Sequence, residues 1–163
     1  MIELFRLAEN VTLDLGALVE PLSVALHARE RANLPEGQVV LVLGAGAVGL
    51  LAAAVNKASK AKAVVIADIQ KDRVDFAVDN GYADAGVVLP MARPATTEAK
   101  LAYAKENADK IKSIMVNGEP IGEFSAVYEC TGVETCLQAS IYVSLYPRHV
   151  LSSSEVRSLI TAG

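Results

Sequence analysis

VVLVLGAGAVGLLAAAV, residues 39–55, is the stretch that decides the fold. It contains no charged residue, and three glycines interrupt it, Gly44, Gly46 and Gly49. Val and Leu before the glycines favour a buried strand, whereas Leu and Ala after them predict a buried helix. A membrane-spanning helix would need about 20 apolar residues and no such change of character. A strand, a glycine turn and a helix therefore explain the stretch better than a membrane span.

Strands and helices alternate along the rest of the chain. The residues Glu20-Pro21 begin the first predicted helix, because proline is tolerated in a first turn, and the turn at 34–37 follows its end. Further helices are predicted over 48–59, 71–80, 101–115, 133–142 and 155–162, and strands over 39–43, 63–67, 86–89, 125–129 and 149–151, with a short edge strand over 2–10. This alternation with short links predicts an α/β fold with a doubly wound parallel sheet.

The three glycines have the G-x-G-x-x-G spacing of a dinucleotide-binding loop, and they lie between a predicted strand and a predicted helix. Gly44 permits a tight turn, Gly46 lets the backbone approach a pyrophosphate, and Gly49 allows close packing of the helix on the sheet. N–H groups at the start of the helix would meet the phosphates. Val48 is expected to pack beside the cofactor.

An acid follows at the position that such a site requires. Asp68 comes directly after the strand over 63–67, where a carboxylate accepts hydrogen bonds from the adenosine ribose and repels a 2′-phosphate. The loop and Asp68 together predict a Rossmann-type domain that binds NAD rather than NADP. Ile69 is a candidate to flank the adenine, and Thr131 is a candidate to line the cleft. Arg73 is a cation that would support a 2′-phosphate, but the acid is closer to the ribose.

The composition excludes several classes of function. The 163 residues carry a net charge of −4 with a pI of about 5.2, so no basic field is available for nucleic acid or anionic lipid. Cys130 and Cys136 are too few for a disulfide framework and are poorly spaced for a metal, so we interpret them as small buried residues. The start, MIELFR, lacks the basic and apolar regions of a signal peptide, and a cytoplasmic location is expected.

Three segments resemble the zinc-dependent medium-chain dehydrogenases, and among them the sorbitol (polyol) dehydrogenases. They are LVEPLSVALHA at 18–28, the glycine loop with IADI at 66–69, and YECTGVE at 128–134. The resemblance implies an enzyme that oxidises a secondary alcohol of a small-molecule polyol to a ketone and passes hydride to NAD. It also implies that Glu20 lies at the catalytic zinc, as carboxylate oxygens bind zinc.

The chain departs from that family at both ends. The domain that supplies the other zinc ligands in the family is missing, and one carboxylate cannot hold zinc. After Tyr142 the Gly-Gly turn and the following strands of the family are replaced, so the sheet is expected to be incomplete at its C-terminal strands. We therefore expect two parts, a remnant of the interdomain segment with its helix over 1–37 and a truncated NAD-binding domain over 38–163. Lys60 stands where the family usually has a helix-ending glycine.

These departures lead to further expectations. The isolated chain, if it folds, is expected to bind NAD weakly and to have no zinc-dependent activity, and its uncovered sheet edge favours a homo-oligomer. An alternative of another class is a non-catalytic nucleotide-binding module or a truncated gene product. A further alternative keeps the family but makes the substrate a simple alcohol or threonine, because the substrate contacts of the family lie mainly outside this chain.

Overall fold

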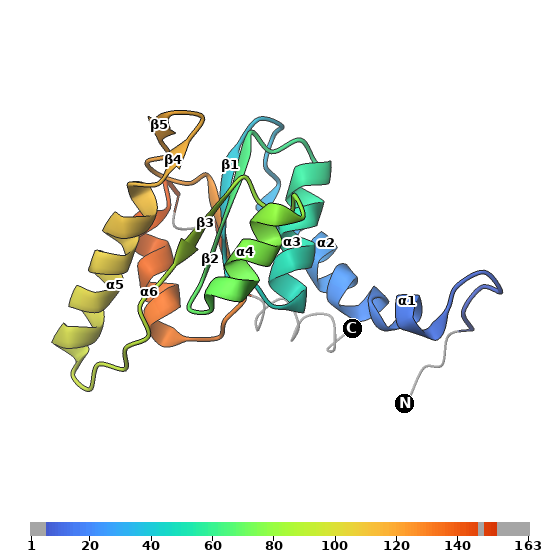
Figure 1. The fold of residues 1–163 in the computed structure, drawn as a ribbon, viewed down its shortest axis with the longest axis horizontal. Helices are drawn as coiled ribbons and strands as arrows, with labels where there is room; N and C mark the ends of the chain where they lie inside the picture. The colour runs from blue at the N-terminus through green and yellow to red at the C-terminus, as the bar shows by residue number, and fades with distance from the viewer. Residues whose placement is uncertain (1–5, 147–148, 153–163) are drawn as a thin grey trace.

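The computed structural model describes residues 6–146 and 149–152, and a five-stranded parallel sheet is its centre (Figure 1). The strand order is β3-β2-β1-β6-β7, and every neighbouring pair is parallel. The strands are β1 (Val39–Leu43), β2 (Ala63–Asp68), β3 (Ala85–Val88), β6 (Ala126–Glu129) and β7 (Val150–Ser152). The predicted α/β fold with a doubly wound parallel sheet is confirmed, including the strand expected at 149–151.

Helices cover both faces of the sheet (Figure 1). Those of one layer are α2 (Val19–Ala32), α3 (Ala47–Ala58) and α4 (Lys71–Asp79), and those of the other are α5 (Thr97–Lys112) and α6 (Glu134–Val143). In β1, Val40 and Val42 pack into the first layer, while Leu41 and Leu43 pack into the second. Because both faces of β1 are buried, the strand reads as an uninterrupted apolar run.

Two predicted elements differ from the structure near the chain start and after α5. Residues 6–10 form no strand, whereas residues 1–5 of the expected edge strand lie outside the described part, and a short helix α1 (Leu13–Ala17) precedes α2. The helix predicted over 101–115 begins at Thr97 and ends at Lys112. Met115 lies instead in β4 (Met115–Val116), paired with β5 (Glu119–Pro120).

The reason for the early end of α5 is the turn that follows it. Asn117 and Gly118 have φ values of +54° and +85°, the left-handed pair that closes a two-residue hairpin. The hairpin takes Met115 out of the helical register that its spacing suggested. The helix predicted over 155–162 lies outside the described residues.

The helix α2 packs against α3 and shares its core. Val24, Ala25, Ala28 and Ala32 join the apolar cluster that also contains Val40 and Val42 of β1. The expected division at residue 37 stays a prediction, as does the pairing of copies through a sheet edge, for which β3 and β7 are the outer strands. Within residues 6–146 and 149–152, no helix is long and apolar enough to cross a membrane.

Candidate functional site

The strand order changes direction between β1 and β6, so the loops that follow these two strands meet at the carboxyl edge of the sheet. Ligands of open α/β sheets bind at such a point. Gly44, directly after β1, has a φ of +98° that a glycine adopts without strain. A Cβ on Gly44 would lie 3.1 Å from Thr131 Cγ2 and 3.2 Å from the Cys130 carbonyl oxygen. The two loops are therefore in direct contact.

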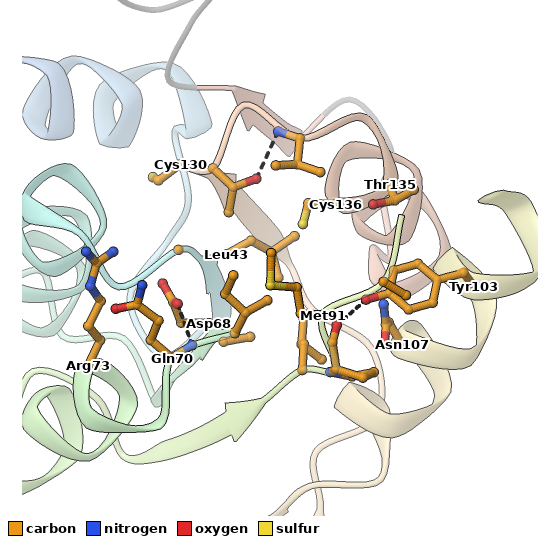
Figure 2. Close-up of a pocket in the computed structure, with 18 of the residues that line it drawn as sticks. Leu43, Asp68, Gln70, Arg73, Met91, Tyr103, Asn107, Cys130, Thr135 and Cys136 are labelled. Carbon is orange, nitrogen blue, oxygen red and sulfur yellow. Dashed lines mark hydrogen bonds between the residues drawn. The ribbon is translucent and has the colours of Figure 1, made fainter. Parts of the chain in front are cut away.

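A cavity of about 360 Å³ opens at this edge. Its walls come from the ends of β1 and β2, the loop after β3, the helix α5 and the loop after β6. Figure 2 shows Asp68 and Arg73 on one side of the cavity, Tyr103 and Asn107 on the other, and Met91 between them. The volume is in the range of sites that hold a small molecule or part of a cofactor.

The cavity brings together most of the residues that the sequence singled out as cofactor-binding. Val48 and Gly49 do not line it: Val48 packs half-buried against the core of the first layer, and Gly49 is buried beneath the loop. A Cβ on Gly49 would lie 1.8 Å from the Gly44 carbonyl oxygen, so only glycine fits there. The predicted residues that line the cavity are Gly44, Gly46, Asp68, Ile69, Arg73 and Thr131.

The backbone at Gly46 is open toward the cavity. Gly46 is the N-cap of α3, and a Cβ built on it would meet nothing within 4 Å. No side chain caps the first turn of this helix. The N–H groups and the positive end of the helix dipole are therefore available to an anionic group, so this part of the chain fits a phosphate.

The Asp68 carboxylate ties the glycine loop to the end of β2. Its Oδ2 accepts a hydrogen bond from the Ala45 N–H at 2.7 Å, and its Oδ1 accepts one from the Gln70 N–H at 2.9 Å. An ionised carboxylate has about four acceptor positions, so both oxygens can still accept hydroxyl groups of a ligand. Asp68 is thus held in one orientation and fits the hydroxyls of a ribose.

Glu129 is a structural partner of the site that the sequence interpretation missed. This carboxylate is 2% exposed at the end of β6, and its Oε1 accepts hydrogen bonds from the N–H groups of Thr131 at 2.7 Å and Gly132 at 3.0 Å, and from the Thr131 hydroxyl. These bonds offset the cost of burying the charge and fix the loop after β6. The sequence contained a signal for this position, because Glu129, like Asp68, is an acidic residue that ends an apolar strand.

The far wall of the cavity was also missed. Tyr103 and Asn107 line it from α5, and Met91 lines it from the loop after β3. Asn107 interrupts the apolar stripe of its helix between Ala104 and Ile111. A polar residue in such a stripe could have indicated a site, but the search for core positions considers only the apolar residues.

Both cysteines also line the cavity. Burial, with a smaller contribution from the Glu129 carboxylate, raises the pKa of the Cys130 thiol to about 12. Burial also raises the pKa of Cys136. At neutral pH both side chains are thus neutral thiols, whereas a cysteine nucleophile reacts as the thiolate.

The described residues do not fit a zinc ion. Glu20 is exposed in the first turn of α2 and does not line the cavity. Among the residues that the structure describes, no three His, Cys, Asp or Glu side chains gather to hold a metal. A catalytic zinc needs about three protein ligands, so no zinc-dependent step follows from these residues, and the role of Glu20 stays a prediction.

Known relatives in sequence are polyol dehydrogenases. The chain is 41% identical over 139 residues to D-xylulose reductase A of Aspergillus niger and 36% identical over 140 residues to sorbitol dehydrogenase of Bos taurus. These matches cover 85% and 86% of this chain but 35% of each relative, so the chain spans about a third of their length. No protein-family model matches the chain.

Solved structures share the fold. Alcohol dehydrogenase TADH from Thermus sp. ATN1 has a TM-score of 0.62 at 18% identity, over 98% of this chain and 50% of that one. A dehydrogenase structure from Sinorhizobium meliloti 1021, bound to NADP, has a TM-score of 0.60 at 21% identity, over 91% and 48%. The resemblance predicted from the sequence is therefore confirmed: over about 85% of its length this chain is similar to zinc-dependent medium-chain dehydrogenases of the sorbitol dehydrogenase type.

Proposed function

We propose that this chain binds NAD in the cavity at the carboxyl edge of β1, β2 and β6. The pyrophosphate would lie against Gly46 and the start of α3, and the adenosine ribose would lie on Asp68. The observation that carries the proposal is the position of the Asp68 carboxylate, which lines the cavity and is held by the Ala45 N–H of the glycine loop at 2.7 Å. A single ligand would thereby contact both halves of the predicted motif.

NAD is the preferred cofactor in this proposal. A 2′-phosphate would lie beside the Asp68 carboxylate, and two like charges in a partly enclosed site repel each other. Arg73 and Arg93 also line the cavity and would favour such a phosphate, but both side chains are exposed, so water screens their charges. The fixed acid therefore outweighs the two exposed cations.

Calorimetric titration of the purified chain with NAD and with NADP tests this proposal. We expect NAD to bind at least about tenfold more tightly, a difference of about 1.4 kcal/mol. Asp68→Asn should weaken NAD binding and remove most of the preference. Asp75→Asn is the matched control, because Asp75 lies on α4 in an ion pair with Lys71 and does not line the cavity. Equal binding of both cofactors by the unaltered chain would contradict the proposal.

We further propose that the bound NAD serves the oxidation of a polyol, or another secondary alcohol, by a zinc enzyme of which this chain forms the coenzyme-binding part. The names of the relatives, D-xylulose reductase and sorbitol dehydrogenase, support this substrate class. The described residues form no zinc site, so we expect the chain alone to oxidise neither sorbitol nor xylitol. NADH formation followed at its absorbance band is the measurement. Turnover by the chain alone that a chelator abolishes would overturn this expectation.

A further inference from the structure

The wall of the cavity formed by α5 contains a polar group that the proposed function leaves unused. Asn107 is 5% exposed and lines the cavity opposite Asp68 (Figure 2). Among the described residues, its carboxamide makes no hydrogen bond, and the carboxamide atoms stay accessible from the cavity that the residue lines. Tyr103, one helical turn earlier, is already engaged, because its hydroxyl donates to the Pro90 carbonyl oxygen. Of the two α5 residues that line the cavity, Asn107 is therefore the one whose polar side chain is still available to a ligand.

The carboxamide of Asn107 has no partner within the described fold, so water or a ligand in the cavity must satisfy it. An apolar residue at position 107 would continue the stripe of Ala104, Ala108 and Ile111. A carboxamide in that stripe, facing the cavity, is instead available to a ligand that supplies both an acceptor and a donor.

The surroundings of Asn107 indicate the chemistry of that ligand. Apart from the exposed Arg93, the lining from the loop after β3 and from α5 is apolar or neutral and includes Leu89, Met91 and Tyr103, and α6 adds the neutral thiol of Cys136. Such walls fit a flat, uncharged ring rather than a phosphate or a sugar. A carboxamide offers one donor and one acceptor side by side, and this pattern matches the amino group and ring nitrogen of adenine.

We infer that Asn107 recognises the purine base of the cofactor and selects adenine over bases that carry an oxygen in place of its amino group. The inference rests on the proposed NAD site, since the ribose on Asp68 would direct the base toward α5. The carboxamide oxygen accepts from the amino group of adenine, and the carboxamide N–H donates to the ring nitrogen N7. Hypoxanthine has an acceptor at both of these positions, so either orientation of the carboxamide leaves its oxygen facing an acceptor.

The experiment compares the affinities of NAD and of nicotinamide hypoxanthine dinucleotide by calorimetry. The unaltered chain should prefer NAD by about fivefold or more, which is the lower limit of the discrimination that a bidentate contact of this kind provides. Asn107→Leu, of similar volume, should reduce that preference to near unity. Asn80→Leu is the matched control, because it makes the same exchange at the end of α4, outside the cavity lining, and should retain the preference.

Stability measurements separate recognition from a structural role. In the absence of cofactor, Asn107→Leu should unfold at the same urea concentration as the unaltered chain or a higher one, because an apolar side chain of similar volume replaces one that makes no hydrogen bond within the described fold. A clear fall in stability would assign Asn107 a structural role and overturn the inference. NAD binding with no discrimination between the two bases, or an unchanged preference in Asn107→Leu, would overturn it as well. Absence of any NAD binding by the unaltered chain would instead refute the proposed function.

Discussion

Two glycines of the same loop have different surroundings. A Cβ on Gly49 would lie 1.8 Å from the Gly44 carbonyl oxygen and 2.9 Å from its carbon, both backbone atoms that cannot move aside cheaply. A Cβ on Gly46 would meet nothing within 4 Å. Gly49 is therefore required by the fold, whereas the protein itself leaves the space over Gly46 empty. The glycine motif therefore meets two separate requirements, close packing at Gly49 and open space for a ligand at Gly46.

Substitution of each glycine by alanine should separate these needs. Gly49→Ala should lower the free energy of unfolding by about 3 kcal/mol or more, because the helix must move away from the loop. Gly46→Ala should change it by about 1 kcal/mol or less, but should weaken NAD binding about tenfold or more. Urea unfolding and calorimetric titration of both variants check this pair. Unchanged NAD affinity in Gly46→Ala would show that the pyrophosphate does not lie there.

The end of helix α3 carries local backbone strain. The helix stops at Ala58, and Lys60, two residues later, has a φ of +59°. This is the left-handed conformation that glycine adopts without cost and that other residues adopt at a cost of about 1 kcal/mol. The Lys60 ammonium pairs with Glu36 at 2.9 Å, but the two side chains are 72% and 68% exposed. Such a pair contributes little to stability.

Lys60→Gly should therefore stabilise the chain by about 1 kcal/mol, because the relief of strain exceeds the loss of an exposed ion pair. The matched control is Lys60→Ala, which also removes the ion pair but keeps a Cβ in the left-handed region, and it should give no gain. Urea unfolding of the three proteins is the measurement. A gain of equal size in Lys60→Ala would show that the lysine charge, rather than the backbone, is unfavourable.

At the scale of the whole molecule, the described residues bury several weak acids in their neutral form. Burial raises the pKa of Tyr128 and Cys136, and it raises the pKa of Cys130 from 9.0 to about 12. In the unfolded chain these groups lose their protons at ordinary values, whereas the folded chain retains them. Stability is thus unaffected below about pH 9 and falls as the pH rises above it.

The alkaline loss of stability should be measurable and should depend on Cys130. At pH 10 the unfolded thiol is mostly ionised, so Cys130 alone should lower the free energy of unfolding by about 1 kcal/mol relative to pH 7.5. Cys130→Ala should lose less stability between the two pH values than the unaltered chain. Urea unfolding in the presence of a reducing agent tests this. An identical loss in both proteins would show that this thiol does not remain protonated in the fold.

Local sequence patterns were sufficient to predict most of the strands and helices and the glycine motif with Asp68. The apolar run at 39–43 has no alternation because both faces of its strand are buried, and this fact is readable from composition alone. The spacing of the glycines and the position of Asp68 likewise depend only on short-range geometry. Where a local turn competed with helical spacing, as at Asn117-Gly118, the periodicity extended the helix too far.

Only the tertiary structure decided what surrounds the motif. Asn107 and Glu129 lie 39 and 61 residues beyond Asp68 in the chain, and no local pattern relates them to it. The sheet order brings the end of β6 beside that of β1, which makes Glu129 the residue that holds the adjacent loop. The packing of α5 on the second face then places Asn107 across the cavity from Asp68. A sequence determines which segments become strands and helices, but the crossovers between them determine which side chains share a site.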